Sequence, residues 1–132
     1  MPPEPPVEFL DLEDVLGFHR ASLNRWGGLD GIRDQGALEA AIAQPQATFD
    51  GEYLHEDLFS MAAAYAFHVG QAQAFVDGNK RTGLLAAVIF LDMNGFRVPE
   101  PEEVLYLAMV EVAERKMTKA QLANLLRELA GV

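Results

Sequence analysis

Residues 57–94, DLFSMAAAYAFHVGQAQAFVDGNKRTGLLAAVIFLDMN, decide the fold. They contain two strongly apolar helical patterns, 57–71 and 79–94, separated by a short stretch of glycine and polar residues. Apolar side chains cover most of the circumference of each pattern, which is typical of helices that are buried on nearly all sides. We therefore predict two adjacent buried helices at the centre of an all-α fold, joined by an exposed loop at 74–78.

Four more helices are predicted around this pair. Capping residues and apolar periodicity place them at 11–26, at 34–43, from 101 onward and from 118 onward. Residues 46–55 have no helical period and are predicted to form an exposed loop or a small hairpin. The expected architecture is all-α, with about six helices.

Length, composition and charge limit the kind of protein. The 132 residues suit one domain, which we expect to span 9–132 after an extended, proline-rich lead-in over 1–8. The formal net charge of −10 argues against a broad nucleic-acid-binding face. The absence of cysteine fits a reducing cytoplasm, and the longest apolar run, 84–91, is far shorter than the ~20 residues that span a bilayer. We expect a cytoplasmic protein with no membrane partner.

The connector between the two buried helices has the composition of an anion site. Gly78 permits close approach to the backbone, and the N–H groups that begin the next helix carry the positive end of its dipole. Lys80 and Arg81 stand in that first turn, where positive charge is unfavourable unless an anion is bound. Asp77 precedes them and is placed to hold Mg²⁺ that bridges to phosphate oxygens. A plain capped turn in which Asp77 pairs with Arg81 explains the same residues, and both interpretations stay open.

Residues 75–82, FVDGNKRT, also resemble the signature loop of the Fic/Doc superfamily, in its Doc (death-on-curing) branch. The resemblance continues in GIRD at 31–34, AQPQATF at 43–49 and FLDMNGF at 90–96. It covers residues 9–129, and an eight-residue loop match with the expected helix on each side is a specific signal. The implied fold is the single-domain, all-helical Fic fold.

This resemblance implies a transferase that binds ATP with Mg²⁺. Most Fic enzymes transfer AMP to a hydroxyl side chain of a target protein, and their loop has a second glycine where this chain has Lys80. The Doc branch keeps a lysine there and transfers the terminal phosphate of ATP to a threonine of translation elongation factor Tu, which halts protein synthesis. AMP transfer remains the alternative for this chain. Segment 46–55 would match the flap that aligns the target peptide.

The resemblance also assigns a role to each residue of the loop. Asp77 would hold Mg²⁺, while Gly78 and Asn79 would cradle phosphate. Lys80 and Arg81 would neutralise the charge that moves during transfer. A toxin–antitoxin system is implied, with a Phd-like antitoxin as partner and with nucleic acid contacted only indirectly through the antitoxin complex.

The match breaks at Gln73, where the family motif has a catalytic histidine two residues before Phe75. That histidine acts as general base on the target hydroxyl, whereas a glutamine amide accepts a hydrogen bond but cannot carry a proton away. We therefore expect impaired transfer. Three explanations stay open: a toxin deliberately disarmed by one His-to-Gln change, a degenerate member that binds without catalysing, or a native glutamine with altered chemistry.

The three histidines elsewhere are not expected to replace the missing base. His68 lies five residues upstream of Gln73, and we interpret it as structural; His19 and His55 have no motif around them. No pair of these histidines has metal-ligand spacing on one helix face. Trp26, at the end of the first predicted helix, is expected to be a packing residue.

Overall fold

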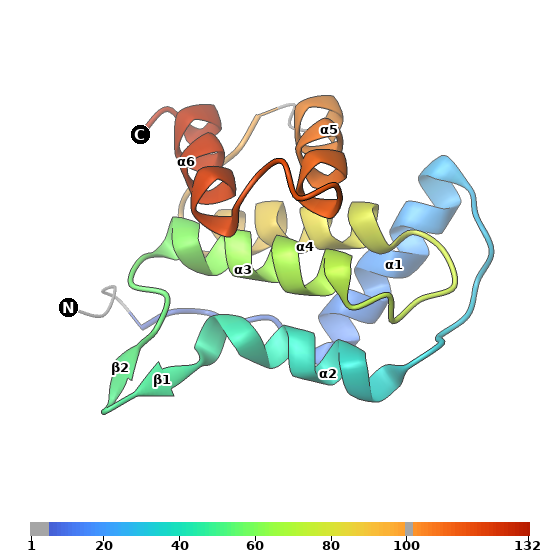
Figure 1. Cartoon of the computed structure of the whole chain (residues 1–132), viewed down its shortest axis with the longest axis horizontal. Coiled ribbons are helices and arrows are strands. Elements are labelled where there is room, and N and C mark those ends of the chain that lie inside the picture. The colour runs from blue at the N-terminus through green and yellow to red at the C-terminus, as the bar shows by residue number, and fades with distance from the viewer. Residues whose placement is uncertain (1–5, 100–101) are drawn as a thin grey trace.

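The computed structural model describes residues 6–99 and 102–132, and over this part the chain forms six α-helices, one 3₁₀ turn and one hairpin (Figure 1). The all-α prediction is confirmed. The expected helix start at residue 101 and residues 1–5 of the expected lead-in lie outside the described residues. The helices are α1 Leu12–Trp26, α2 Gln35–Ala43, α3 Leu58–Gln71, α4 Asn79–Met93, α5 Glu102–Ala113 and α6 Lys119–Ala130.

Local capping chemistry sets the starts of four helices. In each case the capping side chain accepts a hydrogen bond from the N–H group three residues further on, which satisfies a donor that the helix itself leaves unpaired. Each such cap stabilises a helix by about 1 kcal/mol. The capping residues are Asp11, Asp34, Asp57 and Thr118.

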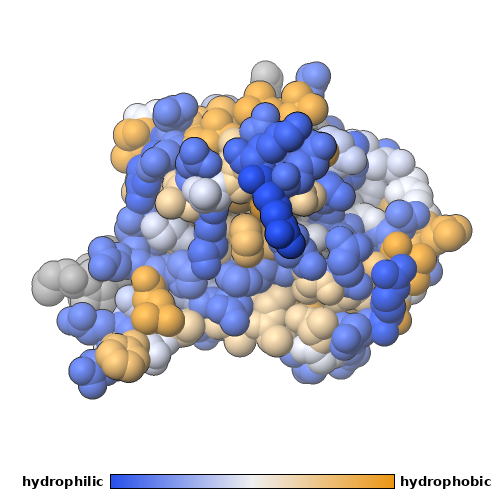
Figure 2. Space-filling view, in the orientation of Figure 1, coloured by the Kyte–Doolittle hydropathy of each residue, from blue (hydrophilic) through white to orange (hydrophobic). Residues whose placement is uncertain are grey.

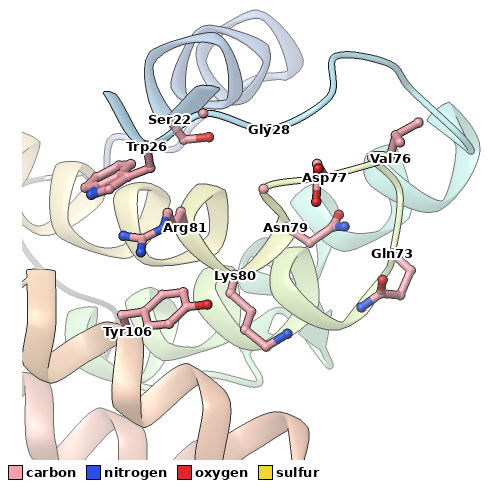
Figure 3. Close-up of a pocket in the computed structure, with 12 residues that line it drawn as sticks. Ser22, Trp26, Gly28, Gln73, Val76, Asp77, Asn79, Lys80, Arg81 and Tyr106 are labelled. Atoms are coloured by element: carbon pink, nitrogen blue, oxygen red, sulfur yellow. The ribbon is translucent and has the colours of Figure 1, made fainter. Parts of the chain in front are cut away.

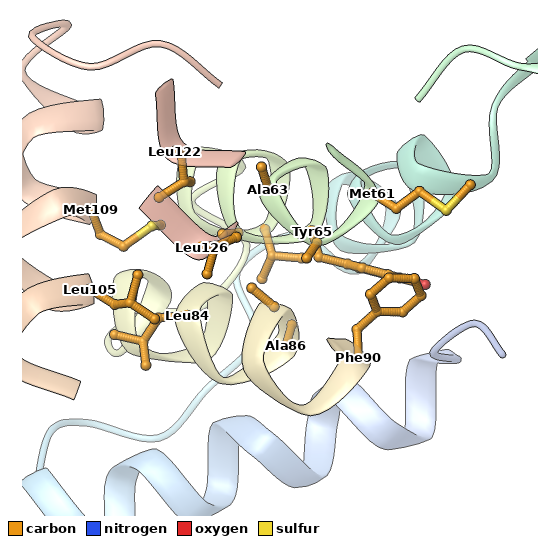
Figure 4. Close-up of a cluster of buried hydrophobic side chains, with 14 of the residues drawn as sticks. Met61, Ala63, Tyr65, Leu84, Ala86, Phe90, Leu105, Met109, Leu122 and Leu126 are labelled. Carbon is orange, nitrogen blue, oxygen red and sulfur yellow. The ribbon is translucent and has the colours of Figure 1, made fainter. Parts of the chain in front are cut away.

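Helices α3 and α4 lie side by side at the centre of the molecule, and the other helices surround them (Figure 1). The two backbones come so close that a Cβ atom on Gly83 would lie 2.7 Å from the Ala66 carbonyl oxygen and 3.1 Å from the Gly70 nitrogen. A side chain at position 83 would therefore push the central helices apart. Figure 4 shows the core between α3, α4, α5 and α6, which includes Met61, Tyr65, Leu84, Phe90, Leu105, Leu122 and Leu126.

The described end of the expected lead-in packs on the domain. Glu8 exchanges two hydrogen bonds of 2.9 Å with the side chain of Asn94, at the end of α4. The Leu10 N–H donates to the buried Tyr65 hydroxyl at 2.9 Å. These contacts tie the segment before α1 to both central helices.

Segment 46–55 contains a hairpin with a two-residue turn. A small hairpin was one of the two structures predicted for this segment, the other being an exposed loop. Strands β1 (Thr48–Phe49) and β2 (Glu52–Tyr53) pair antiparallel across Asp50 and Gly51, whose φ angles are 55° and 81°. An Asp-Gly pair with both φ angles positive is the preferred chemistry for such a tight turn. Figure 2 shows apolar side chains at this projecting end of the molecule, where 73% of Phe49 is exposed.

The connector, residues 72–78, departs from the prediction of an exposed loop. Ala74 and Phe75 are fully buried, whereas Val76 and Asp77 are exposed and Gly78 is partly exposed. The Ala74 carbonyl accepts hydrogen bonds from two N–H groups of the segment before α2, so this half of the connector is covered by another part of the chain. Within residues 6–99 and 102–132, no helix is long and apolar enough to cross a bilayer.

Candidate functional site

A cleft of about 420 Å³ lies where the connector meets the start of α4 (Figure 3). Its walls come from the end of α1, the connector, the first turn of α4 and one residue of α5. Every site residue that the sequence predicted lines this cleft. The lining residues are Ser22, Trp26, Gly27, Gly28, Gln73, Val76, Asp77, Gly78, Asn79, Lys80, Arg81 and Tyr106.

The first turn of α4 presents backbone N–H groups to the cleft. Gly78 is its N-cap and has left-handed angles, φ 81° and ψ 16°, which a residue without a Cβ adopts at low cost. No side chain of the described residues caps this helix, and its first internal hydrogen bond runs from the Thr82 N–H to the Gly78 carbonyl at 2.9 Å. The N–H groups of residues 79–81 precede that bond, so they are available to an anion, which the helix dipole also favours.

The side chain of Asn79 has a structural task. Its amide accepts a hydrogen bond of 3.0 Å from the Phe75 N–H and donates one of 2.9 Å to the Phe75 carbonyl. The side chain is thereby committed to holding the connector against α4. What Asn79 offers to a ligand is its backbone N–H.

A strap formed by residues 31–34 holds the other edge of the connector. The Val76 N–H donates to the Gly31 carbonyl at 3.0 Å, and Ile32 pairs with Phe75 as an isolated antiparallel bridge. Gly31 has φ 142°, and a Cβ there would lie 2.9 Å from a methyl carbon of Val76. The GIRD motif therefore acts as a strap on the connector, although it lies far from it in the sequence.

Asp77 presents one carboxylate to the cleft. Its Oδ2 accepts a hydrogen bond from the Leu29 N–H at 3.0 Å, and its Oδ1 makes no hydrogen bond with the described residues. Among these same residues, Asp77 and Arg81 form no ion pair, so the plain turn held by an Asp77–Arg81 pair is wrong. The described chain also has no group of three His, Cys, Asp or Glu side chains that would hold a metal by itself.

Arg81 lies between two aromatic rings (Figure 3). Its guanidinium carbon is 4.4 Å from the centre of the Trp26 ring and 4.2 Å from that of Tyr106, distances at which a cation is attracted by the face of a ring. Trp26 therefore does more than pack at a helix end, which is all that the sequence predicted. Tyr106 was not predicted at all, because it comes from α5 and has no motif around it.

Gln73 stands at the edge of the cleft away from Trp26 and Arg81 (Figure 3). It follows the last residues of α3 with φ 53°, the left-handed conformation in which many helices end. Glycine usually takes this position, and a residue with a Cβ is strained there by about 1–2 kcal/mol. Gln73 is exposed and lines this edge of the cleft.

His19 is buried and contacts the connector, a contact that the sequence did not predict. Its Nε2 lies 2.8 Å from the Asp77 carbonyl oxygen, and its ring stacks on Phe75 with centroids 3.8 Å apart and planes 8° from parallel. Only 3% of its surface is exposed. A lone histidine in an amphipathic helix gives no signal of this contact, which joins α1 to a connector 58 residues away.

The other two histidines lie away from the cleft. The Lys119 ammonium is 3.1 Å from His55 Nε2 and 3.2 Å from His68 Nε2, so each neutral ring accepts a hydrogen bond from it. Burial, with the nearby charge of Lys119, lowers the pKa of His68 to about 4. The same two causes lower the pKa of His55. His68 is thus structural, as the sequence predicted.

This cluster predicts that the protein loses stability in mild acid. Because the folded-state pKa of His68 is near 4 and the unfolded value is 6.5, the unfolded chain binds more protons between these pH values. The free energy of unfolding should fall as pH drops from 6.5 toward 4, by at most about 1.4 kcal/mol per pH unit for each ring. Urea unfolding at several pH values measures this slope. The slope should be smaller in His68→Gln, and an equal slope in both proteins would contradict the assignment.

Comparisons with known proteins identify the family of the chain. The chain matches the Fic/DOC family over residues 9–91, a span that runs from α1 through most of α4. It is 36% identical over 119 residues to "Protein kinase doc" of Escherichia phage P1, which covers 90% of this chain and 93% of that protein. It is 41% identical over 131 residues to "Toxin Doc" of Mycolicibacterium smegmatis, which covers 95% of this chain and 93% of that one. The chain belongs to the Fic/DOC family, in its Doc branch.

Proposed function

We propose that this chain is a Doc-type toxin that transfers the terminal phosphate of ATP to a hydroxyl side chain of a translation factor similar to elongation factor Tu. The observation that carries the proposal is that Asp77, Lys80 and Arg81 line one cleft with the start of α4, whose first three N–H groups form no hydrogen bond among the described residues. The names of the two relatives support it, since one is called a protein kinase and the other a toxin.

The chemistry of the residues that line the cleft suits a nucleoside triphosphate bound with Mg²⁺. Mg²⁺ in phosphate sites is held by one or two carboxylates together with phosphate oxygens, and Asp77 supplies one carboxylate, whose Oδ1 accepts no hydrogen bond from the described residues. The N–H groups at the start of α4 suit a phosphate group. Bound ATP would supply the phosphoryl group, and a Mg²⁺ ion held by Asp77 would neutralise part of the phosphate charge.

Two side chains would stabilise the charge of the moving phosphoryl group. Catalysis of phosphoryl transfer consists largely of positioning and of electrostatic stabilisation of the equatorial oxygens. Lys80 contributes a point charge, whereas Arg81 is held between Trp26 and Tyr106 and offers a planar fork of donors. A lysine at position 80, where most Fic enzymes have glycine, favours phosphate transfer over AMP transfer.

Gln73 limits this activity. The target hydroxyl must lose its proton as the new bond to phosphorus forms, and Gln73 offers only a hydrogen-bond acceptor at the edge of the cleft. The same observation favours a second candidate function, a binding module that keeps the fold and the nucleotide site without catalysis. In either case we propose a Phd-like antitoxin as partner and the hairpin β1–β2 as the flap that aligns the target peptide.

Labelled ATP separates these functions. The protein and its Gln73→His form are incubated with elongation factor Tu and with ATP labelled at the terminal or at the α-phosphate. We expect the target to receive the terminal label, strongly from Gln73→His and weakly or not at all from the protein as it stands. Label from the α-phosphate would establish AMP transfer instead. Nucleotide binding without label transfer from either form would establish the binding module.

A further inference from the structure

We propose that His19 is a positioning residue for the cleft: from α1, it sets the places of the Asp77 carboxylate and of the α4 N-terminus. The role deepens the proposed function and rests on it, because the groups that His19 positions are those assigned to Mg²⁺ and phosphate. His19 does not line the cleft and would touch neither nucleotide nor target.

The contact between His19 and the connector is directional. A carbonyl oxygen only accepts, so the 2.8 Å contact requires His19 Nε2 to carry the proton and donate it to the Asp77 carbonyl. This bond constrains the peptide group between Asp77 and Gly78. A Cβ on Gly78 would lie 3.5 Å from His19 Cδ2 and 3.1 Å from Ser22 Oγ, so α1 packs directly against the N-cap of α4.

The imidazole ring also fixes the connector through its face. It lies parallel to the Phe75 ring at 3.8 Å, and Phe75 is fully buried. Phenylalanine at position 19 would keep a ring for this stacking but would have no donor. Glutamine would place a donor at a reach similar to that of Nε2 but would have no ring. The two substitutions therefore separate the hydrogen bond from the stacking.

The loss of this hydrogen bond would directly affect the protein groups that are proposed to bind phosphate and Mg²⁺. Rotating the Asp77–Gly78 peptide would turn the Asp77 carboxylate away from the Leu29 N–H and would change the left-handed angles of Gly78. The Gly78 carbonyl receives the first helical bond, from the Thr82 N–H, so the N–H groups before it would lose their common direction. Losing the donor should thus weaken phosphate and metal binding more than it weakens the fold.

The test compares three variants of the full chain. His19→Phe removes the donor, and His19→Gln restores one. Val15→Ala is the matched control, because Val15 is fully buried one turn earlier in α1 and forms no hydrogen bond with the connector among the described residues. For each variant we measure the affinity for ATP with Mg²⁺ by calorimetry, the free energy of unfolding in urea, and the hydrogen exchange of the Val76 and Thr82 N–H groups.

We expect His19→Phe to bind ATP with Mg²⁺ about tenfold more weakly and to exchange the Val76 and Thr82 protons faster. His19→Gln should recover most of the affinity, and Val15→Ala should lose stability while keeping the affinity. Wild-type affinity in His19→Phe, or an equal loss of affinity in Val15→Ala, would overturn the role. If His19→Phe does not fold, His19→Gln decides: slow exchange at Val76 and Thr82 supports the role, and fast exchange overturns it.

The exchange measurement also keeps the two proposals apart. If the unaltered protein does not bind ATP, the proposed function fails. The exchange of the Val76 and Thr82 protons still decides the role of His19, because it needs no nucleotide.

Discussion

Replacing Gln73 with histidine is expected to raise the rate of phosphate transfer by on the order of 10²–10⁴-fold, the contribution of a positioned general base. The ring nitrogen would accept the proton of the target hydroxyl, which the glutamine amide cannot do. Histidine is among the side chains that tolerate the left-handed angles of this position, so the connector should keep its path. The rate is measured with terminally labelled ATP and purified elongation factor Tu.

Nucleotide affinity should hardly change in Gln73→His. The phosphate contacts come from the start of α4 and from Asp77, and a base used mainly in the transition state affects rate more than binding. Asp77→Ala in the Gln73→His background is the control, and it should remove the restored transfer. In cells, Gln73→His should arrest growth unless the antitoxin is present. A folded Gln73→His protein that binds nucleotide but transfers nothing to any target in a lysate would show that the kinase proposal is wrong.

The parts of the fold that were predictable are those with local causes. Asp11, Asp34, Asp57 and Thr118 each cap a helix through atoms three residues away, so the pattern in the chain is enough to place the helix start. The residues predicted to bind an anion line one cleft for the same reason, because the connector and the first turn of α4 are contiguous. Their binding of an anion stays a prediction.

The parts that were missed depend on contacts between distant segments. The strap at 31–34 pairs with Ala74 and Phe75, and a single sequence gives no register for such a bridge. Tyr106 reaches the cleft only because α5 packs on α4. His19 looks like any buried histidine until α1 is placed against the connector. Helix packing directions, and not local propensity, decide these contacts.

The aromatic pair around Arg81 leads to the second large effect. In the Gln73→His background, Arg81→Lys is expected to reduce phosphate transfer by on the order of 10²–10³-fold, the loss that follows removal of one preorganised donor to a transition-state oxygen. Lysine keeps the positive charge but lacks the planar fork, and it would not be held between the Trp26 and Tyr106 rings in the same way. The initial rate with saturating ATP measures the loss.

Tyr106 provides the matched control for this prediction. Tyr106→Phe keeps the ring 4.2 Å from the guanidinium and should transfer phosphate at nearly the parental rate. Tyr106→Leu removes one face of the stack, which leaves Arg81 charged but free to move, and its rate should fall between those of the parent and of Arg81→Lys. This order would show that the geometry of the guanidinium matters in addition to its charge. If Arg81→Lys transfers as fast as its parent, the charge alone suffices, and the two aromatic rings serve only to pack α1 and α5 against the start of α4.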